Sequence, residues 1–253
     1  MKTKIFVISH WYNEELLAPL FLKHYAYADE IHILLDIDTN DNTREILSRQ
    51  SNIVIDNAYC GGFDDAEKTK NLNRAISNVK EGWIYVVDAD EFIFPENFED
   101  VQTFLGRQTA DVVKCINFHV YRHSTEKDID YEKEVIPQRI HALNGGREFR
   151  NWFIKPSVFR ASAGVVLTIG NHSYLGEYTC STERYIGAHW KLADMEIAIR
   201  RRLSNKERMS FENKRKGYSN HEFHITKERI EQLLAKNSNL PILSFLVQNK
   251  EEI

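Results

Sequence analysis

The first half of the chain alternates between short apolar runs and longer segments in which apolar residues recur at helical spacing. The short runs are rich in β-branched and aromatic residues and predict buried strands at 5–8, 31–35, 52–55 and 83–87. Between them, apolar periodicity predicts helices over 13–26, 43–49 and 64–79. This order is typical of a parallel sheet covered by helices on both faces.

The second half has strands separated by polar loops and then a basic, helical end. Strands are predicted at 112–121, 138–143, 157–160 and 165–169. A long basic helix is predicted from Leu192 to Lys216, and a shorter one from about Thr226 to Ala235. We therefore expect an α/β fold with a mixed, mostly parallel sheet and C-terminal helices.

Acidic residues gather where the most hydrophobic strand of the first half ends. Trp83–Val87 runs directly into Asp88, Asp90 and Glu91. Carboxylates so close together at the end of a buried strand repel one another, and a divalent ion removes that cost, because carboxylate oxygens suit Mg²⁺ and Mn²⁺. Ligands of such sheets bind at the carboxyl ends of the strands. The pattern predicts a metal site; the alternative is an acidic turn that caps a helix near 95–104.

Polar residues also follow the second strand. Asp36 opens the segment Asp36-Ile37-Asp38-Thr39-Asn40-Asp41-Asn42-Thr43. A carboxylate at such a strand end can accept hydrogen bonds from a ribose or from the edge of a base. The same residue types also make plain turns and helix N-caps. The segment by itself leaves both interpretations open.

Composition and charge narrow the class of protein. A length of 253 residues allows one large domain, or one domain with a small appendage. The formal net charge of -4 argues against a protein that coats nucleic acid. The three cysteines are widely spaced and form no C-x-x-C pair, which favours a reducing compartment. The first apolar run stops at Ser9-His10, too early for a signal peptide, and we expect a cytoplasmic protein.

Three segments, in this order, resemble glycosyltransferases of the GT-A fold, and most closely family-2-like members. They are His10-Trp11-Tyr12-Asn13-Glu14-Glu15, the Asp36–Thr43 turn, and Asp88-Ala89-Asp90-Glu91-Phe92. In that family an Asn-Glu pair follows the first strand, a turn of the D-x-S-x-x-D-G-T type follows the second, and D-x-D-E-F follows the fourth. The turn departs from the pattern, since Asn42 stands where Gly is usual, although Asn can also adopt the left-handed conformation. A looser likeness continues at 152–157, 170–173 and 189–191.

The resemblance implies roles for residues at the strand ends. Asn13 and Asp36 correspond to residues that contact the nucleoside. Asp88 corresponds to the acid that contacts the ribose or the metal, and Asp90 to the metal ligand. The implied cofactor is Mn²⁺ or Mg²⁺, and the implied donor is a nucleotide-diphosphate sugar, with UDP as the default nucleotide.

The resemblance also implies roles away from the strand ends. Lys70 and Asn73 lie on the helix that often contacts the donor in such enzymes. A late histidine often completes the metal site, which makes His172 the first candidate and His189 the second. An imidazole ligand would favour Mn²⁺.

The implied organisation is a GT-A domain over 1–190 and a C-terminal helical extension over 191–253. Within the domain, 1–94 would be the nucleotide-sugar-binding half and 95–190 the acceptor-side half. The acceptor implied is a carbohydrate or a lipid-linked glycan, in polysaccharide biosynthesis. The basic segment 200–216, interleaved with apolar residues, would allow peripheral contact with an anionic membrane surface, and a solvated charged face is the simpler alternative.

The catalytic base is left unassigned by the sequence. An inverting transferase needs a carboxylate or imidazole within hydrogen-bond reach of the acceptor hydroxyl. Five acidic residues lie in suitable loops, and nothing separates them: Asp128, Asp130, Glu132, Glu177 and Glu183. A retaining mechanism would need no such base.

Two other functions remain open at this stage. One is a phosphohydrolase with Asp88 as nucleophile and Asp90 as acid, although such enzymes usually carry this pair on the first strand of the domain. The other is a catalytically degenerate module that binds a nucleotide sugar without turnover. We predict a metal-dependent glycosyltransferase over both.

Overall fold

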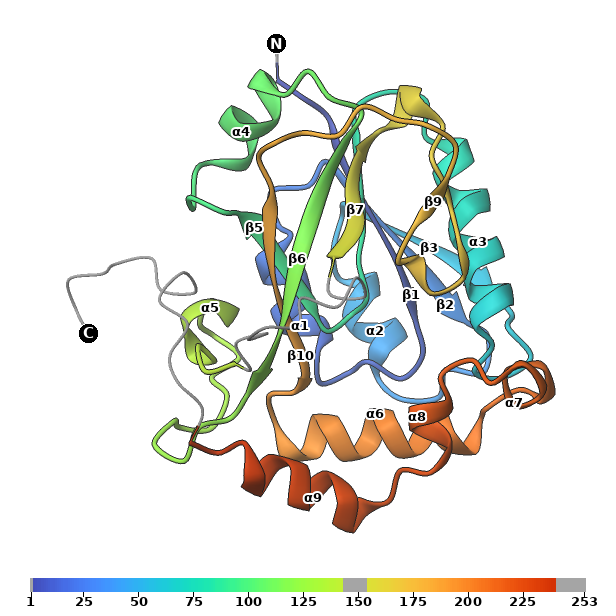
Figure 1. Ribbon diagram of the computed structural model, residues 1–253, viewed down its shortest axis with the longest axis vertical. Helices are drawn as coiled ribbons and strands as arrows, with labels where there is room; N and C mark the ends of the chain where they lie inside the picture. The colour runs from blue at the N-terminus through green and yellow to red at the C-terminus, as the bar shows by residue number, and fades with distance from the viewer. Residues whose placement is uncertain (1, 143–153, 240–253) are drawn as a thin grey trace.

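The computed structural model describes residues 2–142 and 154–239. Its centre is a sheet with strand order β3-β2-β1-β4-β7-β6-β10-β5 (Figure 1). The strands are β1 Ile5–Trp11, β2 Glu30–Asp36, β3 Ile53–Ala58, β4 Trp83–Val86, β5 Glu91–Pro95, β6 Val112–Tyr121, β7 Ile154–Arg160 and β10 Tyr185–Leu192. A separate small sheet pairs β8 Val166–Leu167 with β9 Tyr174–Leu175.

The direction of the strands confirms the predicted fold class. β3, β2, β1 and β4 run parallel to one another, and β6 runs parallel to β10. β7 and β5 are antiparallel to their neighbours. The molecule is therefore an α/β protein with a mixed, mostly parallel sheet. Strands from both halves of the chain share this sheet.

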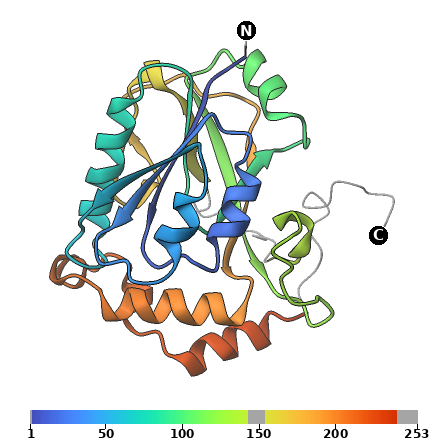
Figure 2. The ribbon, with the colours of Figure 1, turned by 180° about the vertical axis from the view of Figure 1, so that it is seen from behind.

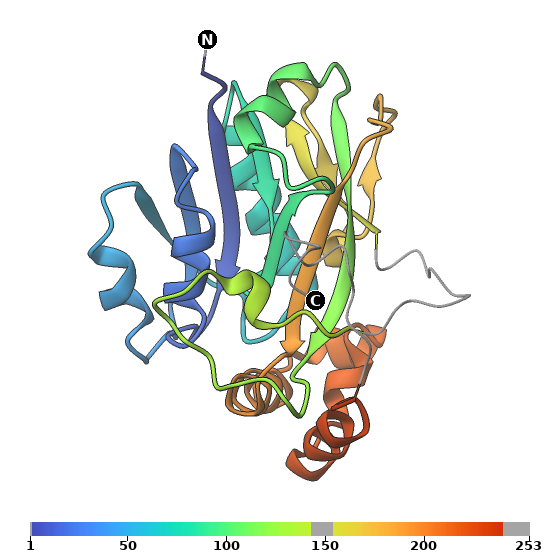
Figure 3. The same cartoon turned by 90° about the vertical axis from the view of Figure 1, so that its left-hand side faces the viewer.

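Helices cover both faces of the sheet. α1 (Ala18–His24) and α2 (Thr43–Ser48) lie on one face, and α3 (Asp65–Asn78) lies on the other (Figure 3). Each face has its own apolar core, built around Phe21 on the first and Leu72 on the second. Two shorter helices, α4 (Val101–Arg107) and α5 (Val135–Gln138), complete this part.

The C-terminal helices lie across one end of the sheet, as seen from both sides in Figures 1 and 2. They are α6 (Met195–Glu207), α7 (Phe211–Lys216), α8 (Asn220–Phe223) and α9 (Lys227–Lys236). α6 and α9 share a small apolar core that includes Ile230 and Leu234. Among the residues that the structure describes, no helix has the length and apolarity needed to cross a membrane.

The first helix begins later than its apolar pattern predicts. Asn13 has a left-handed backbone, with φ 50°. The backbone N–H groups of Glu14 and Glu15 donate to Thr43 Oγ1 at 2.7 Å and to Asp41 Oδ2 at 3.1 Å. These contacts tie the segment after β1 to the turn after β2, and a hydrogen-bonded turn at 15–17 leads into α1, which begins at Ala18.

The long basic helix predicted over 192–216 is divided in two. The backbone around Met209 pairs with Phe63 instead of continuing the helix, with Phe63 N donating to Arg208 O at 2.7 Å and Ser210 N donating to Phe63 O at 3.0 Å. Ser210 then caps α7, because its Oγ accepts from Asn213 N at 3.0 Å. The break turns Arg208 towards the sheet.

Two strand predictions in the second half are wrong over most of their length. In place of a strand over 138–143, α5 ends at Gln138, Ala142 forms an isolated bridge with Val120 of β6, and Tyr121 N donates to His141 O at 2.9 Å; residue 143 lies outside the described residues. In place of a strand over 165–169, β8 has two residues and a 3-10 turn, η3, occupies Ile169–Asn171.

Candidate active site

A cavity of about 580 Å³ opens at the carboxyl ends of β1, β2 and β4. This volume suits a small ligand or cofactor. The cavity is lined by strand ends of the first half, by residues of β6, β7 and β10, and by residues of α6 and α8. The acidic segment after β4 lies in it, as the sequence predicts.

Two lysines bind the acidic residues directly after β4. Lys68 Nζ, from α3, lies 2.6 Å from Asp88 Oδ1. Lys155 Nζ, from the start of β7, lies 3.3 Å from Asp88 Oδ2 and 2.5 Å from Glu91 Oε1. The turn itself is closed by Asp88 N, which donates to Glu91 Oε2 at 3.1 Å. Both oxygens of Asp88 therefore contact fixed ammonium groups.

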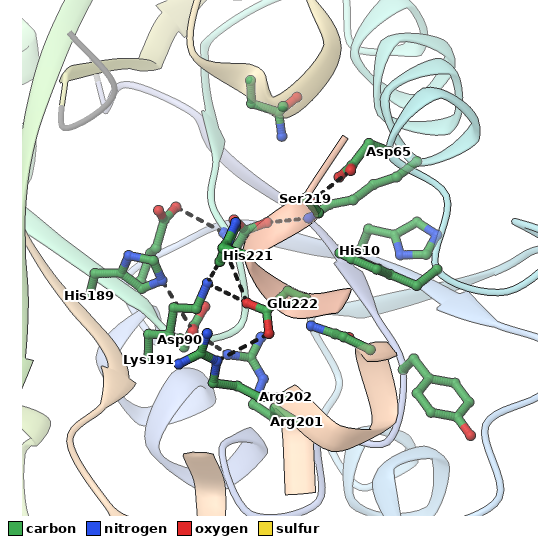
Figure 4. Close-up of a pocket in the computed structure, with 18 of the residues that line it drawn as sticks. His10, Asp65, Asp90, His189, Lys191, Arg201, Arg202, Ser219, His221 and Glu222 are labelled. Carbon is green, nitrogen blue, oxygen red and sulfur yellow. Dashed lines mark hydrogen bonds and ion pairs between the residues drawn. The ribbon is translucent and has the colours of Figure 1, made fainter. Parts of the chain in front are cut away.

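Asp90 is bound by a different pair of cationic or basic groups. Arg201 of α6 forms an ion pair with Asp90 Oδ2, and His189 Nε2 of β10 lies 3.2 Å from the same oxygen. Arg201 also reaches Glu14 Oε1 through Nε at 3.0 Å. Figure 4 shows Asp90, His189 and Arg201 grouped together, with Lys191 and Glu222 beside them.

These contacts set the charge of the acidic residues. Burial alone would raise the pKa of Asp88, but Lys68 and Lys155 outweigh it and hold that pKa well below its usual range. Burial is opposed at Asp90 by Arg201 and His189, and its pKa is likewise lowered. Both residues are carboxylates at neutral pH. Glu14 differs, because burial, only partly offset by Arg201, raises its pKa to about 7.

The other end of the cavity is formed by residues from β1, β2 and the break after α6. Arg208 Nη2 lies 2.7 Å from Asp36 Oδ2, and its guanidinium lies over the Tyr12 ring, 3.3 Å from the centroid. His10 Nε2 and Cys60 Sγ are 3.0 Å apart. Burial, with Lys68 nearby, lowers the pKa of His10 to about 4, so this imidazole is neutral. An aromatic ring, a carboxylate and a neutral imidazole suit a nucleoside better than a phosphate.

Comparison with known proteins decides the class. Residues 7–163, more than half of the chain, match the family described as glycosyl transferase family 2. The chain belongs to this family. Membership makes it a transferase that uses a nucleotide sugar, and it favours this prediction over the phosphohydrolase alternative.

Solved structures similar to this family 2 chain include two of TarS from S. aureus, residues 1–349, one of them in complex with UDP. Both are 15% identical to this chain, and the alignment covers 93% of this chain and 71% of TarS. The TM-scores are 0.44 and, for the UDP complex, 0.43. A search of curated proteins gave no match.

Of the donor-contacting residues that the family resemblance implies, Asp36 and Asp88 line the cavity and three others do not. Asn13 binds the turn after β2, with Nδ2 donating to Asn40 Oδ1 at 2.8 Å. The Lys70 side chain is 74% exposed and pairs with Glu67 on the same helix. Asn73 holds β8 through both backbone groups of Leu167. On α3 it is Lys68, not Lys70, that reaches the cavity.

Both histidines proposed as metal ligands line the cavity, from different elements. His189 contacts Asp90, as described above. His172 follows η3 on the side of the cavity formed by Gly170 and Asn171, and its side chain is exposed. None of the five candidate bases in loops lines the cavity: Asp128, Asp130, Glu132, Glu177 and Glu183.

Asp88 and Asp90 are the carboxylates that could hold a metal at the end of β4. Over residues 2–142 and 154–239, no three His, Cys, Asp or Glu side chains converge as metal ligands. Mg²⁺ in nucleotide sites is commonly held by one or two carboxylates together with substrate phosphates. Asp90, which is buried, and Asp88, which is half-buried, are both ionised and fit that arrangement. They do not form a cage that would hold a metal without the nucleotide.

The sequence left four cationic residues of the site unassigned, namely Lys68, Lys155, Arg201 and Arg208. Lys155 stands in the segment 152–157 that resembles the family, and Arg201 and Arg208 stand in the basic segment 200–216. The packing of α6 against the strand ends brings Arg201 to Asp90, and the break after α6 brings Arg208 to Asp36. The acidic residues at the strand ends were the sequence signal that could have pointed to these cations, because buried carboxylates require cationic partners.

Proposed function

We propose that the protein transfers a hexosyl or related group from a nucleotide-diphosphate sugar, UDP-linked by default, to a glycan or glycoconjugate acceptor. The observation that carries this proposal is the convergence of Lys68, Lys155 and Arg201 on Asp88 and Asp90 at the strand ends. Cleavage of the sugar–phosphate bond leaves negative charge on the diphosphate. Fixed cations in a largely buried site stabilise such charge without reorganising.

Lys68 and Lys155 are charged before any substrate binds. Burial would lower the pKa of Lys155, but Glu91 and Asp88 raise it above its usual value. Burial would also lower the pKa of Lys68, but Asp88 outweighs burial and raises that pKa above its usual value. A diphosphate that enters between them therefore meets two ammonium groups already in position. Asp36 and Tyr12, at the other end of the cavity, would receive the nucleoside.

Metal dependence is part of the proposal, with Asp88 and Asp90 as the residues that would hold Mn²⁺ or Mg²⁺. The described lining of the cavity carries eight carboxylates against six Lys and Arg side chains. A diphosphate adds more negative charge, which a divalent ion bound with it would offset. The ion would supply Lewis-acid stabilisation of the leaving diphosphate. Whether His172 or His189 joins the metal site is part of the same proposal.

A thermal-shift series tests the donor site. The protein is melted alone, with Mn²⁺ or Mg²⁺, with UDP or another nucleoside diphosphate, and with both. Ligand at about 100 times its dissociation constant adds roughly 2.7 kcal/mol, which should raise the midpoint by about 5–10 °C. We expect one nucleotide to produce this shift only with metal, and the shift to disappear in Asp90→Asn. No shift with any nucleotide–metal pair would contradict the proposal and favour a degenerate module.

The proposal includes two further features, which concern the organisation of the chain and its contact with membranes. One is the division of the chain into a domain over 1–190 and a helical extension over 191–253; β10 ends at Leu192 and only helices follow it in the described residues. The other is peripheral membrane contact through 200–216, which would fall to the basic residues of α7 because the arginines of α6 face carboxylates. Flotation without enrichment on anionic vesicles would contradict the membrane contact.

A further inference from the structure

Two asparagines line the cavity, and each has an amide atom that is shielded from solvent. Asn117 Nδ2 and Asn171 Oδ1 are shielded from solvent and have no hydrogen-bond partner among the residues that the structure describes. Asn117 is 3% exposed and Asn171 is 8% exposed. A buried polar atom without a partner costs about 1–3 kcal/mol. The wall of this cavity contains two such atoms, and each of them lowers the free energy of unfolding.

The sheet is built to make room for the amide of Asn117. Asn117 on β6 stands opposite Gly187 on β10, and a Cβ at Gly187 would lie 1.8 Å from Asn117 Oδ1. No other side chain fits at position 187 unless the amide moves. Asn117 Oδ1 accepts only a weak S–H bond from Cys115, at 3.7 Å. An apolar side chain of the same branching at position 117 would avoid the unpaired amide altogether.

Asn171 carries a backbone cost in addition. Its φ is 59°, directly after Gly170 at 82°. A non-glycine residue in the left-handed region costs of order 1 kcal/mol or more, and Asn tolerates it better than most. Asn171 N donates to Thr168 O at 2.9 Å, and Thr168 N donates to Ser173 O at 2.9 Å, which fixes the turn. η3 packs against α3 and β7, so this turn forms part of the cavity wall.

The position of Asn117 links it to the diphosphate end of the cavity. Lys155 pairs in register with Cys115, two residues from Asn117 on β6, and its Nζ contacts Asp88. A group attached to a diphosphate at Asp88 would therefore lie near Asn117. The two amides carry no net charge, so they suit neutral hydroxyl groups on that attached group.

We propose that Asn117 and Asn171 form a subsite for the hydroxyl groups of a neutral hexopyranose ring, an inference that rests on the proposed function. A sugar hydroxyl both donates and accepts, so two hydroxyls can satisfy the donor of Asn117 and the acceptor of Asn171. The terminal torsion of an asparagine is soft, which lets each amide turn towards the ring. The ring belongs either to the donor or to the acceptor, and the chemistry of recognition is the same.

The test uses two variants that remove the amides without harming the fold. Asn117→Leu keeps the branching of the side chain, and Asn171→Gly keeps the left-handed backbone. Both should keep or raise the thermal midpoint, because each removes an unpaired buried amide. Asn78→Leu, at an exposed position outside the cavity, is the matched control. A structural role for the two asparagines would instead lower the midpoint.

Binding is measured by titration calorimetry with UDP, UDP-glucose, UDP-galactose and UDP-N-acetylglucosamine, and by saturation-transfer NMR with the free hexoses in the presence of UDP. We expect UDP affinity to stay unchanged in both variants. A loss of about tenfold in affinity for at least one UDP-sugar assigns the subsite to the donor ring. Loss of the free-hexose signal alone assigns it to the acceptor ring.

Wild-type binding of every probe by both variants overturns the subsite, and so does a fall in midpoint together with weaker UDP binding. Failure of the wild-type protein to bind UDP or any other nucleoside diphosphate in the same titrations contradicts the proposed function itself, and the subsite with it. The two failures are thereby distinguished by the wild-type nucleotide titration.

Discussion

At the scale of single residues, function in this site depends on small offsets along an element. Lys68 and Lys70 lie two positions apart on α3, yet Lys68 binds Asp88 and Lys70 points into solvent. Residues two apart on a helix face different directions. The same helix therefore offers one lysine to the donor site and one to the surface, and the two provide a natural pair for comparison.

Replacement of Lys68 tests the role of the fixed cations. Lys68→Met is expected to lower kcat by about 10²-fold or more, the scale seen when one preorganised donor to a developing anion is removed. Lys70→Met should stay within about twofold of the wild type. Steady-state kinetics with a nucleotide sugar, including slow donor hydrolysis, provide the measurement. Equal effects of the two substitutions would mean that the charge of α3 as a whole, not the contact with Asp88, is what matters.

At the scale of elements, the break between α6 and α7 is the feature that completes the site. Backbone pairing of Phe63 with the chain at Met209 ends the helix and directs Arg208 to Asp36 and Tyr12. This pairing requires a close approach at Gly62, whose φ is 98° and where a Cβ would lie 2.2 Å from Arg208 O. A glycine is needed here both for conformation and for space.

Gly62→Ala should therefore damage both stability and nucleotide binding. We expect a loss of at least about 1–3 kcal/mol in the free energy of unfolding, from strain and displacement of the 208–210 segment. Gly106→Ala is the matched control, because Gly106 lies within α4 and nothing lies within 4 Å of an added Cβ. That variant should gain about 0.5–1 kcal/mol. Chemical denaturation of both variants gives the comparison; wild-type stability in Gly62→Ala would disprove the close approach.

At the scale of the whole molecule, buried histidines couple folding to pH. His24 of α1 packs against β5, with Nε2 3.0 Å from Ile93 O, and burial lowers its pKa to about 4. Burial, with His189 nearby, lowers the pKa of His119 to about 2. The unfolded chain binds protons at these histidines near pH 6.5, before the folded protein does. Stability is therefore lost as the pH falls from about 6.5 towards 4.

A single variant isolates one part of this pH dependence. His24→Gln keeps a donor for Ile93 O but cannot take up a proton. The wild-type free energy of unfolding should fall by roughly 3 kcal/mol more than that of the variant between pH 6.5 and pH 4. His24 does not line the cavity, so activity at pH 7 should change little. Urea denaturation across the pH range measures the difference, and parallel curves for the two proteins would contradict the prediction.

The sequence by itself determined the alternation of strands and helices in the first half, the acidic cluster after β4 and the position of Asp36 at the end of β2. These features follow from local patterns, since neighbouring residues alone determine the apolar periodicity of an element and the polar residues at its end. The local sequence did not predict where α1 begins or where the basic helix ends. The segment before α1 is tied to the Asp41–Thr43 turn, and the basic helix ends where its backbone pairs with Phe63; neither partner lies in a sequence window around those helices.

Only the tertiary structure decided which side chains meet. The partners of Asp88 come from α3 and β7, and those of Asp90 from β10 and α6, up to about a hundred residues along the chain. The basic segment after β10, which the sequence makes a candidate for contact with a membrane surface, also supplies Arg201 and Arg208 to the cavity. Periodicity predicts which residues share a face of one element. The contacts of a buried charge are set by how distant elements pack, because its partner has only to be near in space.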